Sequence, residues 1–326
     1  MLRSWIAAAL VTFALALPLV APAGAAIAGP ASDVSVVEFP LPNPDSRPYT
    51  IVAGPNGSLW FTESSRGAIG QITPWGSIKE YMLPDPGSGP YGITLGADRN
   101  LWFTERFTDR IGKITPQGVI TEYGGLTPNA QPWDITALPD GTFWFTEENV
   151  DQVGRIDQSG SVSEYPTGPG SLPTFIATGP DGNVWFTEEL GNNIVRLTPG
   201  NPPTMTEFPL LTEGALPWDI NPGPDGNLWF TELAGRHIGK ITPQGTVTEY
   251  PVSGEFGIAG IAAAPAADRL WFTENDSGKV GSITTRGEVG PRFDTGSYPF
   301  GITAGPDGNM WFCVGFGNAI GRVNLR

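Results

Sequence analysis

The chain has 326 residues, of which 11% are aromatic and 16% charged, and its net charge is −15 at pH 7, from 18 Lys and Arg against 33 Asp and Glu. This acidity argues against nucleic acid or an anionic membrane as a partner, because binding to phosphate groups needs concentrated Lys and Arg. The single His and the single Cys exclude a histidine-rich zinc site and a Cys–His nucleophilic pair.

The N-terminal segment has the pattern of a targeting sequence. Arg3 precedes an apolar run from Trp5 to Val20, and small residues then follow at Ala26-Ile27-Ala28, as at a signal-peptide cleavage site. We predict a secretory signal peptide over residues 1–28, a folded domain over 29–326, and a secreted or periplasmic protein. A lone N-terminal transmembrane anchor is the alternative. No later stretch is long enough to span a bilayer, so we expect no membrane span after cleavage.

A tetrapeptide, Trp-Phe-Thr-Glu, recurs through the rest of the chain, complete or nearly so, at spacings of 40 to 44 residues. A fixed period in this range indicates a repeat protein whose units cannot bury their apolar faces alone. The tryptophans of the seven repeats are Trp60, Trp102, Trp144, Trp185, Trp229, Trp271 and Trp311.

Each repeat contains four short runs typical of antiparallel strands. In the second repeat these runs lie at 92–95, 101–104, 111–115 and 119–123, and the segments between them are rich in Gly, Pro, Asn and Asp. Seven four-stranded units arranged radially make an all-β, seven-bladed β-propeller. We expect the tryptophans to form the core between blades, since large aromatic side chains dominate core packing.

The two ends of the domain predict how the ring closes. Residues 36–40 match the fourth strand of the other repeats, whereas the last repeat stops after its third strand at 320–325. The N-terminal strand should therefore complete the last blade. Closure of the ring in this way removes an exposed strand edge.

The two faces of the propeller should differ. The links between first and second strands and between third and fourth strands are predicted to be tight turns on one face. The loops from second to third strands and the connections between blades then lie on the other, which we call the long-loop face. We expect these segments to be longer and more varied and to carry a ligand site.

The starts of the innermost strands carry a series of bulky residues, mostly after Pro. Their side chains should surround the mouth of the axial channel, where aromatic rings form an apolar platform for a ligand. The alternative is that they only plug the channel. The residues predicted to contact a ligand are Tyr49, Tyr91, Trp133, Trp218 and Phe300, with Asp134 and Asp219 as polar anchors.

Six of the Trp strands end in Glu: Glu63, Glu105, Glu147, Glu188, Glu232 and Glu274. We expect each carboxylate to accept hydrogen bonds from backbone N–H groups, because a residue shared by almost every blade suits the scaffold. A ring of carboxylates for a metal is the alternative, although close like charges would raise their pKa values and cost stability. His237 follows one of these strands at a position of variable residue type and is expected to face solvent.

The repeat resembles that of the virginiamycin B lyase (streptogramin B lyase) family, over essentially the whole chain after residue 28. The resemblance is carried by Gly-Pro-Tyr-Gly-Ile-Thr at 89–94, Leu-Trp-Phe-Thr-Glu at 101–105, Ile-Gly-Lys-Ile-Thr-Pro-Gln-Gly at 111–118 and Thr-Glu-Tyr at 121–123. It implies a seven-bladed propeller that opens a cyclic depsipeptide antibiotic by Mg²⁺-dependent elimination.

The chain departs from the residues that the resemblance implies for this chemistry. The family uses two histidines at the starts of inner strands in the last two blades, and glutamates near the seventh. Ala259 and Phe300 stand at the histidine positions, and Tyr298 and Val314 at the glutamate positions. The general base is therefore missing, and its loss costs ~10²–10⁴-fold in rate.

We accordingly assign no catalytic residue and no metal ligand, and Mg²⁺ enters by the resemblance only. We expect a monomer that binds a small molecule or a protein on the long-loop face. One alternative is an enzyme, either an Mg²⁺-dependent carbon–oxygen lyase acting on a cyclic depsipeptide or a lactonase-like enzyme of other specificity. A purely structural or protein-interaction propeller is the other.

Overall fold

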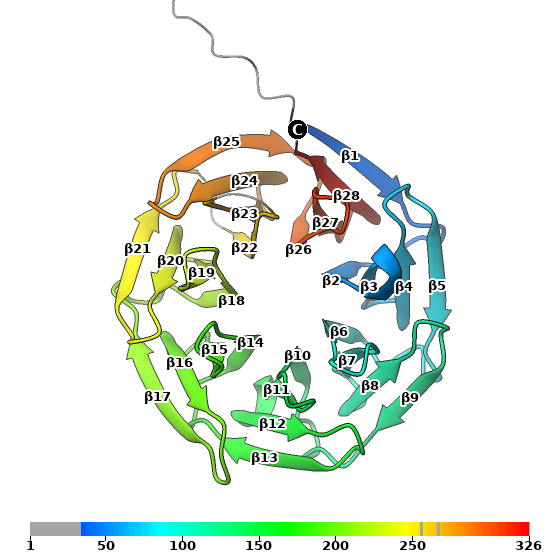
Figure 1. Ribbon diagram of the computed structural model, residues 1–326, viewed down its shortest axis with the longest axis vertical. Coiled ribbons are helices and arrows are strands. Elements are labelled where there is room, and N and C mark those ends of the chain that lie inside the picture. The colour runs from blue at the N-terminus through cyan, green and yellow to red at the C-terminus, as the bar shows by residue number, and fades with distance from the viewer. Residues whose placement is uncertain (1–33, 255–256, 266–267, 326) are drawn as a thin grey trace, which may run out of the picture. The chain divides into compact units, whose positions relative to one another are not determined.

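The computed structural model describes residues 34–254, 257–265 and 268–325. Within these residues the chain forms seven four-stranded antiparallel sheets arranged as blades around a central axis (Figure 1), as the Trp spacing predicts. None of the described helices is long and apolar enough to cross a membrane. The predicted signal peptide and its boundary with the domain lie outside the described residues.

Blades 1 to 4 run in chain order, and each is given from its inner to its outer strand. Blade 1 has β2 (Pro48–Ala53), β3 (Leu59–Glu63), β4 (Ala68–Ile72) and β5 (Ile78–Met82). Blade 2 has β6 (Pro90–Leu95), β7 (Leu101–Glu105), β8 (Arg110–Ile114) and β9 (Ile120–Tyr123). Blade 3 has β10 (Pro132–Ala137), β11 (Phe143–Glu147), β12 (Gln152–Ile156) and β13 (Val162–Pro166). Blade 4 has β14 (Pro173–Thr178), β15 (Val184–Glu188), β16 (Asn193–Thr198) and β17 (Thr204–Pro209).

The remaining blades follow the same order. Blade 5 has β18 (Pro217–Pro222), β19 (Leu228–Glu232), β20 (His237–Ile241) and β21 (Val247–Pro251). Blade 6 has β22 (Ile258–Ala263), β23 (Arg269–Glu274), β24 (Lys279–Thr284) and β25 (Val289–Asp294). Blade 7 has β26 (Pro299–Ala304), β27 (Met310–Val314), β28 (Ala319–Asn324) and, outermost, β1 (Ser35–Pro40). Two 3₁₀ turns, η1 (Pro55–Gly57) and η2 (Glu148–Val150), lie between strands.

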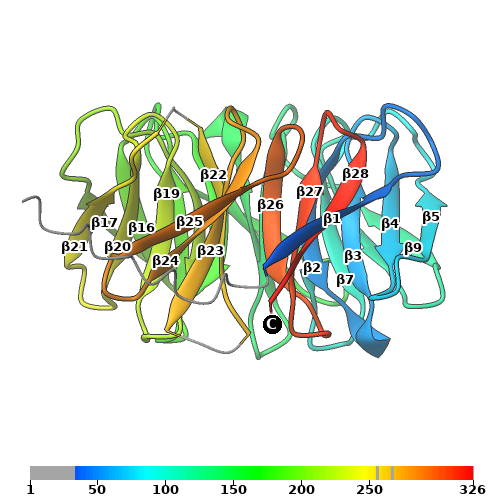
Figure 2. The ribbon, with the colours of Figure 1, turned by 90° about the horizontal axis from the view of Figure 1, so that it is seen from above.

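The N-terminal strand closes the ring, as predicted. β1 pairs antiparallel with β28, from Ser35 opposite Asn324 to Pro40 opposite Ala319. Figure 2 shows β1 lying along β28 at the outer edge of blade 7. The ring of Phe39 on β1 stacks on that of Trp311, with centroids 5.4 Å apart, so the closing strand also completes the hydrophobic core.

The repeat tryptophans are buried between blades, which confirms their predicted role in the core. Each packs against an aromatic ring on the outermost strand of its own blade. The pairs are Trp60–Tyr81, Trp102–Tyr123, Trp144–Tyr165, Trp185–Phe208, Trp229–Tyr250, Trp271–Phe293 and Trp311–Phe39. In four blades the indole N–H also donates to the Asp of the preceding Pro/Gly turn or its equivalent, as Trp229 does to Asp225 at 3.0 Å.

The threonine of the repeated tetrapeptide links neighbouring blades. Thr104 Oγ1 donates to the carbonyl of Trp133 in the next blade at 2.8 Å and accepts from the N–H of Gly92 in its own blade at 2.9 Å. The same pair of bonds occurs in blades 1 to 6, and the donors are Thr62, Thr104, Thr146, Thr187, Thr231 and Thr273. Blade 7 has Cys313 there, fully buried as expected and without such a bond among the described residues.

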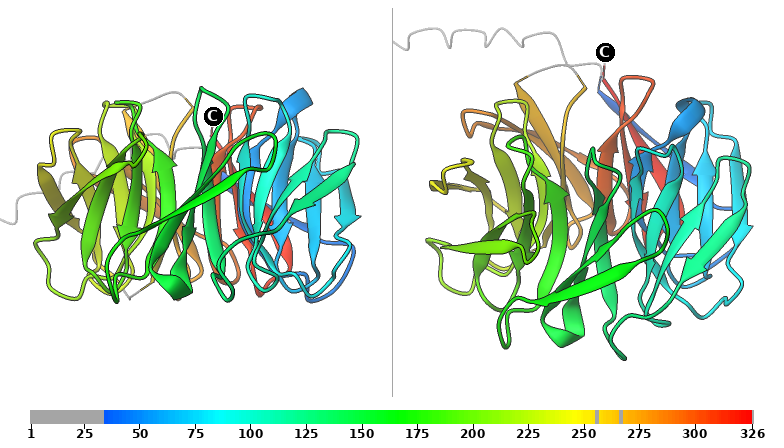
Figure 3. Two further views of the ribbon diagram at one scale, coloured as in Figure 1. Left: turned by 90° about the horizontal axis from the view of Figure 1, so that it is seen from below. Right: turned by 60° about the horizontal axis from the view of Figure 1, so that its bottom comes forward.

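The turns and loops lie at the two faces of the ring, as the side views show (Figures 2 and 3). The expectation that the loops from second to third strands are long is wrong. They span 64–67, 106–109, 148–151, 189–192, 233–236, 275–278 and 315–318, and are as short as the tight turns. Variation in length on the long-loop face comes instead from the connections between blades.

The last residue of several of these short loops fastens the next blade. Asp109, Asp151, Asn192 and Asn318 have positive φ, which Asn and Asp tolerate better than most residues. Their side-chain oxygens accept backbone N–H groups of the connection that leads into the next blade, as Asn318 does from Ser46 at 2.8 Å. The long-loop face is therefore held together by side-chain hydrogen bonds.

Candidate functional site

Each inner strand starts with a bulge at the long-loop face. In blade 2, for example, the register shifts between Pro90 and Ile93, and the N–H of Gly92 bonds to Thr104 instead of to the ladder. A bulge inserts an extra residue and re-aims the neighbouring side chains. In blades 1, 3 and 5 the side chains of two successive residues therefore lie around the axis.

The five predicted aromatic residues come together at this end of the channel. The ring centroids of Tyr49 and Tyr91 are 4.5 Å apart, those of Tyr91 and Trp133 are 5.0 Å apart, and those of Tyr49 and Phe300 are 5.3 Å apart. Trp133 packs edge-on against Trp218 at 5.5 Å. Since these contacts join blades 7, 1, 2, 3 and 5 across the axis, the rings form a layer that closes the long-loop end of the channel, which we call the aromatic layer.

Sequence reasoning missed one member of the aromatic layer. Phe175 contacts both Trp133 and Trp218, and only 8% of its surface is exposed. Thr174, which directly follows Pro in this blade, is instead fully buried and bonded to Thr187. Phe175 follows Thr174 by one position. The bulge turns this position toward the axis, so the sequence could have predicted Phe175 had both positions been considered.

Two hollows lie on either side of the aromatic layer. The first, of about 380 Å³, opens on the long-loop face above blades 7, 1 and 2, and we call it the groove. Its lining includes Arg47, Tyr49, Tyr91, Phe107, Phe300 and Phe316. The second, of about 290 Å³, is the axial channel, lined by residues of all seven inner strands.

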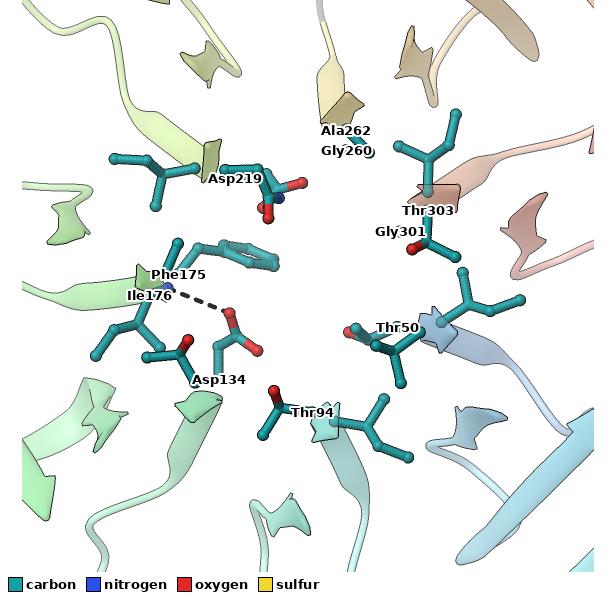
Figure 4. Close-up of a pocket in the computed structure, with 18 of the residues that line it drawn as sticks. Thr50, Thr94, Asp134, Phe175, Ile176, Asp219, Gly260, Ala262, Gly301 and Thr303 are labelled. Atoms are coloured by element: carbon teal, nitrogen blue, oxygen red, sulfur yellow. Dashed lines mark hydrogen bonds between the residues drawn. The ribbon is translucent and has the colours of Figure 1, made fainter. Parts of the chain in front are cut away.

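Asp134 and Asp219 lie in the channel and not in the groove. Figure 4 shows both carboxyls pointing into the channel from β10 and β18, with Phe175 between them. Asp134 accepts the N–H of Ile176 at 3.2 Å, and Asp219 accepts that of Ile261 at 2.8 Å, so each Asp also bridges to the next blade. Burial raises the pKa of both carboxyls to about 7.

A charged cluster that the sequence did not suggest lies at the mouth of the channel, beside the groove, on the loops of blades 2, 3 and 4. The guanidinium of Arg106 lies 4.2 Å from the centroid of Trp133 and pairs with Glu148 at 2.5 Å. Burial, with the charge of Glu148 beside it, raises the pKa of Glu189 to about 6. These three residues directly follow the Glu that ends the second strand in blades 2, 3 and 4, and this shared position was the available signal.

The strand-end glutamates do not accept backbone N–H groups, so that expectation is wrong. Among the described residues, Glu63 and Glu147 have no hydrogen-bond partner on either carboxylate oxygen, and the other four bond only to side chains such as Thr108 and Arg292. Burial is the main cause that raises the pKa of Glu147 to about 9, and Glu164 on the outer strand adds to it. These glutamates face partners within their own blades, so they do not form a common metal ring.

His237 was expected to face solvent, and it does so only in part. Its side chain is only 25% exposed, and its Nδ1 lies 3.1 Å from Oε2 of Glu232.

The positions that the family resemblance assigns to catalysis carry neither a histidine nor a carboxylate. Ala259 is buried, and its carbonyl accepts the hydroxyl of Thr231. Phe300 belongs to the aromatic layer, and Val314 is fully buried. Tyr298 is 43% exposed and packs edge-on against Phe316.

The fold and these hollows define a seven-bladed β-propeller with space for a ligand on its axis. The profile of the virginiamycin B lyase family matches residues 34–290 and 168–326, two overlapping stretches that together span the propeller. The chain belongs to the virginiamycin B lyase family.

Solved structures agree with this assignment. The chain is 35% identical to a streptogramin B lyase, with a TM-score of 0.85 over 90% of this chain and 98% of that one. It is 34% identical to a catalytically inactive histidine-to-alanine variant of virginiamycin B lyase from Staphylococcus aureus with quinupristin, with a TM-score of 0.84 over 90% of this chain and all of that one. Hydrazine synthase from Kuenenia stuttgartiensis, at 14% identity and a TM-score of 0.70 over 88% of this chain and 97% of that one, shares the fold alone. A comparison with curated protein sequences gave no match.

Proposed function

We propose that this protein binds a small, largely apolar ligand in the groove and does not catalyse the elimination that its family name implies. The observation that carries the proposal is the aromatic lining of a ligand-sized hollow whose floor includes Phe300 at a position of the family's chemistry. Export, an environment outside the cytoplasm and a monomeric state are part of the same proposal, and a protein partner on the long-loop face is its variant.

The groove suits an aromatic or depsipeptide-like ligand. Its volume of about 380 Å³ falls within the range of ~300–1,000 Å³ that is usual for small-molecule sites. Phe107 and Phe316 stand on its rim with 60% and 56% of their surfaces exposed, an arrangement that leaves apolar area for a ligand to cover. The guanidinium of Arg47 lies 4.8 Å from the ring of Phe316 and supplies a donor at the edge.

The chemistry argues against elimination. Removal of a proton requires a positioned base, and the side chains of Ala259, Phe300 and Val314 can neither accept a proton nor ligate Mg²⁺. In the relative from Staphylococcus aureus, the exchange of one histidine for alanine gives a protein described as catalytically inactive. In this chain the two histidine positions and two glutamate positions that the resemblance implies carry other residues.

The decisive experiment is incubation of the purified protein with quinupristin, with Mg²⁺ or with a chelator, followed by chromatography and mass spectrometry. We expect no product. A shifted peak of unchanged mass that forms only with Mg²⁺ means elimination and refutes the proposal, and a product heavier by one water means hydrolysis and refutes it as well.

Binding is tested separately by titration calorimetry with quinupristin as the probe. Replacing Phe316 by Ala removes about 1–1.4 kcal/mol of apolar contact, so binding should weaken roughly 5- to 10-fold. Trp75 is the matched control, since it is 89% exposed but lies in a tight turn on the opposite face. If quinupristin does not bind, or if Phe316→Ala and Trp75→Ala bind it equally, the groove is not its site.

A second candidate function rests on the channel. Two carboxyls with pKa values raised to about 7 face one cavity, and a cation between them would let both ionise. This arrangement favours an enzyme of other specificity that holds a cation there. Metal-dependent activity that is lost on Asp134→Ala or Asp219→Ala, and kept in Phe316→Ala, would favour this candidate over the groove.

A further inference from the structure

Blade 5 contains a set of side chains, far from the groove in the ring, that has the composition of a metal site. One ligand atom from each of Glu232, His237 and Glu249 lies within 4.8 Å of the other two. Glu232 ends β19 and His237 begins β20, both at the long-loop face, and Glu249 is the middle residue of β21, the outer strand of the same blade. We call this set the blade 5 triad.

The surrounding backbone is shaped to hold the triad. A Cβ at Gly235 would lie 2.1 Å from Oε2 of Glu232, so only glycine leaves room for that carboxylate. Glu249 is held in place by the connection from blade 4, because it accepts the N–H of Leu211 at 2.8 Å and both the N–H and the hydroxyl of Thr212 at 3.2 and 2.7 Å. Hydrogen bonds of this kind orient the side chains that ligate metals.

A buried atom without a partner points to a missing ligand. The side chain of Glu232 is fully buried, and among the described residues its Oε1 atom has no hydrogen-bond partner, as is also true of at least one oxygen of Glu63, Glu105, Glu147 and Glu188; blade 5 differs in having an imidazole beside this carboxylate. A buried carboxylate oxygen left unpaired costs free energy, and buried charges are normally paired or coordinate a metal. A cation in the triad would neutralise this buried carboxylate.

In the other blades the strand-end glutamate has different neighbours. In blades 1, 2 and 6 an arginine pairs with a carboxylate of the local acidic group, namely Arg66 with Glu80, Arg110 with Glu122 and Arg292 with Glu274. In blades 3 and 4 the residue that matches His237 carries an amide, Gln152 or Asn193. Blade 5 alone combines two carboxylates with an imidazole, since the chain has a single histidine.

We propose that the blade 5 triad binds a divalent first-row transition metal ion, of which Zn²⁺ is the representative. One imidazole nitrogen and two carboxylate oxygens supply three ligands, water fills the fourth position, and imidazole favours such ions over Mg²⁺ or Ca²⁺. Ligands at ~2.0–2.1 Å from a tetrahedral centre lie about 3.3 Å apart. The distance of 3.1 Å between Nδ1 of His237 and Oε2 of Glu232 is close to this value. The ion neutralises the two carboxylates and ties β19, β20 and β21 to the blade 4 connection.

The test is metal binding by the purified chain without a histidine tag, freed of metal with a chelator and titrated with Zn²⁺ in equilibrium dialysis. We expect about one ion per chain, and Co²⁺ in place of Zn²⁺ should give the visible absorption of a tetrahedral site. His237→Ala should weaken binding more than about tenfold, because even the loss of an outer partner costs 10- to 100-fold. This substitution is compatible with the fold, since Ala68 and Ala319 occupy the matching positions in blades 1 and 7.

Asn193→Ala is the matched control, because Asn193 occupies the same position in blade 4 beside Glu188 and should leave Zn²⁺ binding unchanged. The proposal is overturned if the unmodified chain binds no Zn²⁺, or if His237→Ala binds it as tightly as the unmodified chain. Equal loss of binding in Asn193→Ala and His237→Ala would also overturn it. A melting temperature that rises with Zn²⁺ in the unmodified chain and not in His237→Ala gives an independent readout.

Discussion

Replacing Thr104 by Val should destabilise the propeller by about 2–4 kcal/mol. The two side chains have nearly the same shape, so the exchange removes the hydroxyl and little else. Thr104 Oγ1 joins the N–H of Gly92 at 2.9 Å to the carbonyl of Trp133 at 2.8 Å, and both bonds are buried. Each backbone group left without a partner costs ~1–3 kcal/mol.

The measurement is thermal unfolding followed by calorimetry. For a domain of this length, 1 kcal/mol shifts the melting temperature by about 2 °C, so we expect a decrease of roughly 4–8 °C. Thr104→Ser keeps the hydroxyl and should retain most of the stability. Thr115→Val is the control, because the hydroxyl of Thr115 accepts one exposed N–H in a tight turn. The view that this threonine links the blades is refuted if Thr104→Val melts no lower than Thr115→Val.

Three further predictions concern the closure and the buried acids. Cys313→Thr should raise the melting temperature by about 1–3 °C, because it restores at blade 7 the hydroxyl that links the other blades, worth ~0.5–1.5 kcal/mol. Asn318→Gly keeps the positive φ but removes the side-chain oxygen that accepts the N–H of Ser46. The free energy of unfolding, measured with denaturant, should fall by about 1 kcal/mol. An unchanged free energy of unfolding would rule out a role of Asn318 in holding the next blade. Burial raises the pKa of Glu147 to about 9, so its folded carboxyl keeps a proton that the unfolded chain releases above pH ~4.5. The stability that this proton contributes is fully present below pH ~4.5 and is lost as the pH rises toward 9. Glu147→Gln should therefore lessen the fall of the urea unfolding midpoint between pH 5 and pH 9. A fall as steep as in the unmodified chain would contradict the raised pKa of Glu147.

The repeat allowed the fold to be predicted from the sequence, because each blade is a local unit. Trp60 and its six counterparts gave the number of blades, and the match of residues 36–40 to other outer strands gave the closure. Neither prediction needed long-range contacts. The loops from second to third strands were expected to be long and are short. Asp109 and Asn318, at their ends, accept backbone N–H groups of the connection to the next blade, and the sequence pattern does not reveal these hydrogen bonds.

The site was only partly predictable for a related reason. The five aromatic residues after the start of the inner strands were found, because they share one position in the repeat. Phe175 was missed because a bulge breaks the alternation of side chains by which strand faces are read. The approach of Glu164 to Glu147, and the contact of His237 with Glu232, depend on side chains converging across a twisted blade, which strand assignment alone does not give.

The residues at the positions that the resemblance assigns to catalysis fit one another. Phe300 packs on Tyr49, and a Cβ at Gly315 would lie 2.7 Å from the Phe300 ring, so the small residue beside it gives the ring its space. Val314, just before Gly315, is fully buried in the core between blades and has no polar atom in its side chain. The seventh blade is thus organised around an apolar ring where the resemblance expects an imidazole and a carboxylate. A histidine introduced at position 300 would place a base on an apolar layer with no carboxylate at 314 to orient it or to share a metal. We therefore infer that a change toward elimination would require several substitutions together.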